Sequence, residues 1–290
     1  MSLEPSTRSM EPLCLRAFSA QADPVQMHPG LHGIKPEAEA AKPKETEEQQ
    51  STYWLMQPVY SPDYLRSVTP KHLPVESLHQ RVGHAGVQLL RRVFDAATGY
   101  GHDMTPERWL RRFIFLETVA GVPGFVAGML RHMRSLRSMK RDNGWIHTLL
   151  EEAENERMHL LTFLNYRQPG PIMRGLVLLG QGVFLNAYLL AYTLSPRTCH
   201  SFVGYLEEEA VKTYTRALED MDAGRLPEWK DLPAPKIAQD YWKLPEGATM
   251  YELLLNVRAD EACHSHVNHT FAELKPNDTN PFVPGTVHLP

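Results

Sequence analysis

Five segments of the chain carry apolar residues at helical spacing, and four of them hold a glutamate inside the apolar stripe. A carboxylate on the buried face of a helix is costly unless a cation, a proton or hydrogen-bond donors compensate it. No useful stretch alternates apolar and polar residues as a strand does, so the pattern predicts an all-α bundle. The five segments are residues 106–135, 142–166, 172–194, 199–220 and 248–273.

Three Glu-x-x-His pairs place a carboxylate and an imidazole about one helical turn apart. One such pair means little, because a chain with 14 His is expected to contain one by chance. Glu76 and His79 lie beside Pro74, where no apolar stripe would bury them, and we interpret them as the chance match. The two pairs with a helical context are Glu156/His159 and Glu261/His264.

The helical register indicates which acids face the core. At about 100° per residue, Glu156 and His159 share a stripe with Leu149, which places both on the side expected to be buried. Glu152 is only about 40° from Glu156, so geometry alone leaves it open as a ligand. Glu261 shares its face with apolar residues in the same way.

Two further glutamates interrupt apolar faces. In the acidic run at 207–209, Glu207 is turned inward, because it lies within about 60° of Val203 and Tyr214, whereas the next two glutamates are rotated away. Glu117 lies on a stripe whose small members, such as Gly121, leave room beside it.

These helices supply one Glu from each of two segments and a Glu-x-x-His pair from each of two others, a pattern typical of di-iron and di-manganese bundles. Carboxylate and imidazole ligands suit two Fe ions with open positions for O₂. The three Cys form no C-x-x-C, so any metal would be held by oxygen and nitrogen. The alternative is a set of buried ion pairs between helices, for which Arg157 and Arg258 are close in sequence.

The beginning of the chain looks irregular, because it combines a Lys/Glu/Gln-rich stretch with several prolines. We expect an irregular region at 1–75, a helical domain at 76–275 and a tail at 276–290. A transit segment in the first region is only weakly indicated, since its basic residues are accompanied by acidic ones. The formal net charge of −4 argues against a nucleic-acid partner.

Two segments, 113–130 and 175–194, are unusually apolar. The second has about the length of a bilayer span, but the mean hydropathy of −0.37 excludes a polytopic membrane protein. Each segment is interpreted as a buried bundle helix or as a helix lying in the membrane interface. In the interfacial interpretation the basic residues near lipid headgroups are Arg111, Arg112, Arg131, Arg134 and Arg137.

Four motifs around these acids are long and specific. They are Leu-Glu-Thr at 116–118, Ala-Glu-Asn-Glu-Arg-Met-His-Leu at 153–160, Leu-Glu-Glu-Glu-Ala at 206–210 and Arg-Ala-Asp-Glu-Ala-Cys-His at 258–264. With them the sequence closely resembles the alternative oxidases, the cyanide-insensitive ubiquinol oxidases of mitochondria, over about residues 85–275. The resemblance implies a ferritin-like four-helix di-iron bundle with extra membrane-interface helices and an irregular N-terminal arm.

Carried over residue by residue, the resemblance implies two Fe ions per chain and selects Glu156 over Glu152. Tyr214 matches a tyrosine proposed to be redox-active and therefore catalytic. The implied metal ligands are Glu117, Glu156, His159, Glu207, Glu261 and His264.

The resemblance also implies polar residues that orient the ligands and a pocket for the quinol. The orienting residues are Asn155, His200, Trp242 and Asp260. The pocket residues are Arg112, Leu116, Ala210 and Thr213, with Arg91 as a looser match.

The implied reaction converts two ubiquinol and O₂ to two ubiquinone and two water, without proton pumping. The implied protein is a homodimer that sits monotopically on the matrix side of the mitochondrial inner membrane, which favours the interfacial interpretation of the apolar segments. Residues 132–141 are expected at the dimer contact. Three alternatives stay open: a plastid-type plastoquinol oxidase, a di-iron hydroxylase or ferritin-like iron store, and a non-enzymatic membrane-bound helical protein with buried ion pairs.

Overall fold

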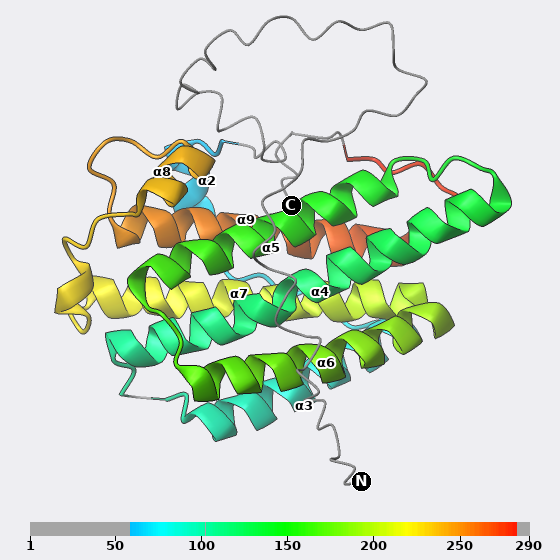
Figure 1. The fold of residues 1–290 in the computed structure, drawn as a ribbon. Coiled ribbons are helices and arrows are strands. Elements are labelled where there is room, and N and C mark those ends of the chain that lie inside the picture. Colours follow the sequence, from blue (N-terminus) through cyan, green and yellow to red (C-terminus); the bar gives the residue numbers. More distant parts are fainter. Residues whose placement is uncertain (1–58, 102, 283–290) are drawn as a thin grey trace, which may run out of the picture. The chain divides into compact units, whose positions relative to one another are not determined.

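The computed structural model describes residues 59–101 and 103–282, which are helical almost throughout. Within these residues the isolated bridge between Pro233 and Thr249 is the one strand-like pairing, so the prediction of an all-α fold is confirmed. In chain order the elements are α2 (Pro62–Ser67), α3 (Leu78–Thr98), α4 (Pro106–Ser138), α5 (Trp145–Tyr166), α6 (Pro171–Leu194), α7 (Pro196–Asp222), the 3₁₀-helix η3 (Pro227–Trp229), α8 (Lys236–Trp242) and α9 (Met250–Glu273) (Figure 1).

Four of these helices, α4, α5, α7 and α9, form a bundle. α4 packs mainly on α5 and α7 mainly on α9, and smaller contacts of α4 with α7 and of α5 with α9 close the bundle. α3 lies against α7, and α6 lies against α4 and α7 (Figure 1). The bundle therefore consists of the four helices whose sequences place a glutamate on an apolar face.

The helix boundaries follow from local capping chemistry. Thr105 accepts a hydrogen bond from the Arg108 backbone N–H, and Pro106 occupies the first turn of α4, as the sequence indicates. Thr249 and Glu252 form a reciprocal capping box at the start of α9. These caps fix the register of two ligand-bearing helices at their N-termini.

Three short helices were not predicted from the sequence. α2 lies inside the region expected to be irregular, of which residues 1–58 are outside the described part of the chain. η3 and α8 form in the proline-rich stretch near the end of α7, where they bury Trp229 and Trp242 in the main core cluster. Proline marks chain breaks reliably but does not show whether a short helix resumes between them.

The two apolar segments differ in their surroundings. α4 and α6 are both long and apolar enough to cross a membrane, but 56% of the most apolar window of α4 is buried inside the protein against 11% of that of α6. The segment 113–130 is therefore mostly a bundle helix, and the segment 175–194 is a surface helix. The prediction that arginines lie near lipid headgroups is wrong for Arg112 and Arg131. Both are buried, in ion pairs with Asp95 and Asp142.

Large apolar side chains are exposed along both α3 and α6, and both helices contact Phe115 of α4. Phe94 of α3 stacks on the Phe115 ring at 5.3 Å, and Gly180 of α6 faces the same ring. The exposed apolar residues of the two helices are Leu78, Val82, Leu89, Leu90, Val93, Ile172, Leu176, Leu178, Leu179, Val183, Leu185, Leu190 and Leu194.

α4 and α5 approach closely at Gly124. A Cβ atom at this position would lie 2.6 Å from the Leu149 carbonyl oxygen and 3.2 Å from the Ala153 amide nitrogen. Both contacts are to backbone, which cannot move aside as a flexible side chain can. The close approach brings the α4 and α5 ligands to the same level of the bundle.

We expect Gly124→Ala to push α4 away from α5 and to destabilise the protein by about 1–3 kcal/mol, the usual cost of overpacking. The measurement is the midpoint of thermal unfolding of the purified protein. Gly182→Ala is the matched control, because no other element of the described structure lies within 4 Å of its added Cβ, and it should leave the midpoint unchanged or raise it slightly. Equal midpoints for Gly124→Ala and wild type would contradict the close packing.

Candidate metal centre

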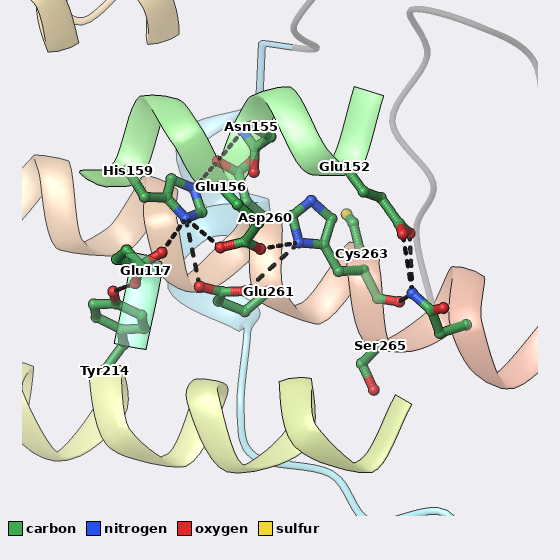
Figure 2. A network of polar contacts seen from close by, with 12 residues as sticks. Glu117, Glu152, Asn155, Glu156, His159, Tyr214, Asp260, Glu261, Cys263 and Ser265 are labelled. Atoms are coloured by element: carbon green, nitrogen blue, oxygen red, sulfur yellow. Dashed lines mark hydrogen bonds and ion pairs between the residues drawn. The ribbon is translucent and has the colours of Figure 1, made fainter. Parts of the chain in front are cut away.

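Four buried residues from three bundle helices offer metal-ligand atoms that all lie within 4.8 Å of one another. They are Glu117 of α4, Glu156 and His159 of α5, and Glu261 of α9 (Figure 2). Three carboxylates in one apolar bundle repel one another and cannot all ionise without a compensating charge. The group is therefore the candidate metal centre of the described residues.

His159 points one ring nitrogen into this group and the other away from it. Its Nδ1 lies 3.3 Å from Glu117 Oε2, 3.5 Å from Glu156 Oε2 and 3.5 Å from Glu261 Oε1. Its Nε2 lies 3.0 Å from Asp260 Oδ2. A proton on Nε2, donated to Asp260, leaves the Nδ1 lone pair facing the carboxylates, as a metal ligand requires.

The donor set fits a cation. Glu117 Oε2, both Glu156 oxygens, His159 Nδ1 and Glu261 Oε2 are buried and have no partner with hydrogen-bond geometry. Buried polar atoms are rarely left in this state, since each costs the desolvation free energy of the group. Oxygen and imidazole nitrogen are ligands suited to a hard or borderline divalent ion such as Fe(II) or Mn(II).

The other two predicted ligands adjoin this group. His264 Nδ1 lies 2.9 Å from Glu156 Oε1 and 3.6 Å from Glu261 Oε2. Glu207 of α7 is buried, and the carboxylates of Glu261 and Glu156 act on its pKa. All six predicted ligands therefore gather in one part of the bundle, with four of them in the tight group.

Burial raises the pKa values of Glu117, Glu207 and Glu261, and the neighbouring carboxylates raise them further. Burial also opposes the charge of Glu156, but the imidazoles of His159 and His264 outweigh it and lower the pKa of Glu156. Without a cation the cluster therefore retains protons above the usual pH range of glutamate. A metal ion must displace these protons, so metal affinity should fall as the pH falls.

Asp260 connects the centre to several surrounding residues. Its Oδ2 accepts hydrogen bonds from His159 Nε2 at 3.0 Å, Asn155 Nδ2 at 3.0 Å and Trp242 Nε1 at 2.8 Å. Burial opposes the charge of Asp260, but the imidazoles of His159 and His264 and the Tyr60 hydrogen bond together outweigh it and lower the pKa of Asp260. The structure thus brings three of the four predicted orienting residues, Asn155, Trp242 and Asp260, together behind His159. Figure 2 shows Asn155 and Asp260 beside the His159 ring.

The fourth, His200, lies elsewhere. Its Nδ1 is 3.0 Å from Asn268 Oδ1 and its Nε2 is 3.1 Å from the Tyr192 hydroxyl, so it contacts none of the six predicted ligands through these hydrogen bonds. Asn268 donates in turn to both oxygens of Glu152, each at 3.1 Å. His200 lies near the start of α7, at a different level of the bundle from the metal group, and residue spacing within α7 does not reveal this difference.

Glu152 and Glu156 have different surroundings. Glu152 faces Asn268 of α9, and burial raises its pKa to about 7. Glu156 belongs to the tight group of ligand atoms and Glu152 does not (Figure 2). Position along the helix axis, which register does not show, thus favours Glu156 over Glu152 as a ligand.

The three glutamates of the acidic run separate in the same way. Glu207 faces the other carboxylates, whereas Glu208 is also buried but contacts His72 at 2.7 Å and His269 at 2.9 Å. Glu209 pairs with Arg91 at 2.7 Å. The prediction that Glu207 alone turns towards the bundle interior agrees with these contacts, although Glu208 is not solvated.

Tyr214 of α7 donates its hydroxyl proton to Glu117 Oε1 and is buried. Its ring stacks on Phe113 at 4.7 Å. Burial and the Glu117 carboxylate raise the pKa of Tyr214, so it keeps its proton. The predicted redox tyrosine is therefore one hydrogen bond from a predicted ligand (Figure 2).

The predicted quinol-pocket residues come from α3, α4 and α7. Arg91 and Arg112 both bind Asp95, at 2.8 Å and 2.6 Å. Arg91 and Thr213 donate to the same Glu209 carbonyl oxygen, at 3.2 Å and 2.8 Å. Leu116 and Ala210 are half-buried and directly adjoin Glu117 and the acidic run in sequence.

Two residues at these sites were not predicted from the sequence. Asp95 joins the two pocket arginines, and its i,i+4 spacing from Arg91 is a signal that could have identified it. Tyr60 donates to Asp260 at 2.6 Å from 200 positions away, a distance over which helical periodicity carries no information. The pair interpreted as a chance match lies apart, because His79 contacts Ser201 at 2.7 Å and Glu76 precedes α3.

Comparisons with known proteins agree with this centre. The family model described as alternative oxidase matches residues 60–273. The chain is 59% identical over 244 residues to the "Alternative oxidase, mitochondrial" of Emericella nidulans, covering 80% of this chain and 69% of that protein. It is 52% identical over 260 residues to the protein of the same name from Ajellomyces capsulatus, covering 83% of this chain and 73% of that protein. The protein of that name from Yarrowia lipolytica is 50% identical over 241 residues, which cover 79% of this chain and 68% of that protein.

Identities of about half to three-fifths over most of the chain are far beyond chance, and the family match spans the positions of all six predicted ligands. The chain therefore belongs to the alternative oxidase family.

Proposed function

We propose that this chain is a mitochondrial ubiquinol oxidase that works at a non-haem di-iron centre. It oxidises two ubiquinol with one O₂ to two ubiquinone and two water. The buried Glu117, Glu156, His159 and Glu261 group carries this proposal, because its ligand atoms lie close together and five of them have no partner with hydrogen-bond geometry. Family membership supplies the reaction.

Two iron ions are the proposed metal content, held by Glu117, Glu156, His159, Glu207, Glu261 and His264. Four carboxylates and two imidazoles balance two divalent ions and leave positions for a small ligand. When bound, the iron pair supplies the O₂ binding and the electron exchange that no side chain of this cluster can provide. The protein orients the ligands, excludes water and holds the protons.

Tyr214 is the proposed redox residue. Its hydroxyl lies within hydrogen-bond reach of Glu117, and its environment of Phe113 and Phe163 excludes water. A tyrosine that keeps its proton beside a ligand carboxylate is placed to give up an electron and to pass that proton to Glu117 Oε1.

The quinol is proposed to bind where Arg112, Leu116, Ala210 and Thr213 converge, with Arg91 at the edge. Arg112 and Thr213 are buried polar residues, so they can hydrogen-bond quinol oxygens in a dry site. Asp95 holds both arginines in place, at 2.6 Å and 2.8 Å. The proposed quinol site directly adjoins the proposed metal ligands, since Leu116 and Glu117 are neighbours on α4.

The apolar surface of α3 and α6 supports attachment to one leaflet of the inner membrane. Isolated exposed leucines are ordinary, but two neighbouring helices that expose them along their length indicate a membrane or protein contact. A lipid-soluble quinol would reach Arg112 from this side, because α3 and α4 both contribute to its pocket. We propose monotopic binding on the matrix side.

A homodimer is also proposed, with residues 132–141 in its contact. This end of α4 exposes Met133, Leu136 and Met139, which a partner surface could cover. The plastoquinol alternative has less support, because the curated relatives are named mitochondrial. A hydroxylase and a non-enzymatic protein are separated by the experiments below.

The direct test is oxygen uptake by the purified full chain in liposomes with a ubiquinol analogue. We expect cyanide-insensitive uptake, abolished by a hydroxamate inhibitor, with two quinol consumed per O₂ and no oxygenated product. Substituting a plastoquinol analogue tests the plastid-type alternative. Cyanide-sensitive uptake, no uptake by iron-loaded protein, or oxygen found in an organic product would contradict the proposal.

A second prediction distinguishes Glu156, the proposed ligand, from Glu152 one turn earlier on α5. Glu156→Gln removes a ligand charge from the tight group and should weaken Fe(II) binding by more than about 100-fold, beyond the effect of changing an outer partner. Glu152→Gln, which changes a buried carboxylate outside the group, should keep the iron content. Metal analysis after gel filtration measures both, and equal iron content in the two variants would refute the assignment.

A further inference from the structure

The segment ahead of α3, residues 59–76, lies against α7 and α9, and we refer to it as the strap. Tyr60 and Val68 of the strap are buried in a cluster with Val211 of α7 and Ala259 and Cys263 of α9. It includes α2, which packs on α9. The strap therefore covers the two helices that carry Glu207 and Glu261.

One end of the strap is fixed on Asp260. The Tyr60 hydroxyl donates to Asp260 Oδ1 at 2.6 Å, which is shorter than the hydrogen bonds that Oδ2 receives from His159, Asn155 and Trp242. Both residues are buried, at 6% and 1% exposure. A short bond from a hydroxyl to a buried carboxylate is charge-assisted and holds that carboxylate in one orientation.

The far end of the strap is fixed on Glu208. His72 Nδ1 lies 2.7 Å from Glu208 Oε2, and the Leu73 backbone N–H donates to Glu208 Oε1 at 3.0 Å. Between the two ends, Arg258 donates to the Leu65 carbonyl oxygen at 2.8 Å. The strap thus binds the residue directly before Glu261 and the residue directly after Glu207.

The orientation of Asp260 determines which ring nitrogen of His159 faces the predicted metal ligands. Asp260 Oδ2 accepts from His159 Nε2, which keeps Nδ1 towards Glu117, Glu156 and Glu261. A carboxylate held at both oxygens cannot rotate away from the imidazole. When Oδ1 loses the Tyr60 donor, the carboxylate is held less firmly in this orientation, which weakens its hold on His159.

We propose that Tyr60 is a positioning residue for the metal centre, acting through Asp260 on His159. This inference rests on the proposed iron site and adds to it a determinant from outside the four-helix bundle. Partners one step beyond the ligands commonly change metal affinity by about 10–100-fold, and we expect Tyr60, one step further out, to lie near the lower figure.

The test compares Tyr60→Phe with Tyr64→Phe in the full chain loaded with Fe(II). Both substitutions remove one hydroxyl that lies 3.7 Å from Cys263 Sγ, but only the Tyr60 hydroxyl also donates to Asp260. An excess of a coloured ferrous chelator reports the rate of iron release. We expect release about tenfold faster from Tyr60→Phe and within about twofold of wild type from Tyr64→Phe.

The thermal midpoint of the metal-free proteins separates positioning from packing. We expect both variants to stay folded well above the temperature of the release assay, so that a difference in iron release reports on the metal site and not on unfolding. Equal release from Tyr60→Phe and wild type overturns the inference, as does equally fast release from both variants, which would show a packing role of the strap. A folded wild type that retains no iron overturns the proposed iron site as well.

Discussion

The structure depends on the burial of several carboxylates next to one another. Glu117, Glu156 and Glu261 place ligand atoms within 4.8 Å of each other and of His159, inside a helical bundle. Such a group is unstable as a set of charges, and burial raises the pKa values of Glu117 and Glu261 accordingly. Protons or cations must compensate its charge, and the unpaired ligand atoms that face one another suit cations.

The surrounding residues can be understood from this constraint. Asp260 fixes the ring of His159, and Trp242, Asn155 and Tyr60 fix Asp260. Each comes from a different element, including α8 and the segment ahead of α3 that lie outside the bundle. The candidate metal centre therefore depends on tertiary contacts from several elements. The proposed quinol site includes α3, which packs on α7, and the apolar surface of α3 and α6 lies against α4 and α7.

Helical periodicity was sufficient to predict the bundle helices and the inward faces of Glu117, Glu156, Glu207 and Glu261. It could not predict how far along the helix axis a side chain lies, or which residues of other elements it contacts. Register left Glu152 beside Glu156 because the two are about 40° apart on the helix, whereas in space Glu152 faces Asn268. In the sequence Arg112 and Arg131 look like headgroup-facing residues, yet both are buried and pair with the half-buried Asp95 and Asp142. Composition likewise cannot distinguish lipid from protein as the neighbour of an apolar helix such as α4.

The most direct test of this account is to titrate the metal-free, folded chain with Fe(II) under anaerobic conditions and to measure bound iron and released protons together. Because the raised pKa values of Glu117, Glu207 and Glu261 keep protons on the cluster, we predict two Fe per chain, proton release on binding and weaker binding as the pH falls. A folded chain that binds no iron, or binds it without releasing protons, would contradict the central claim.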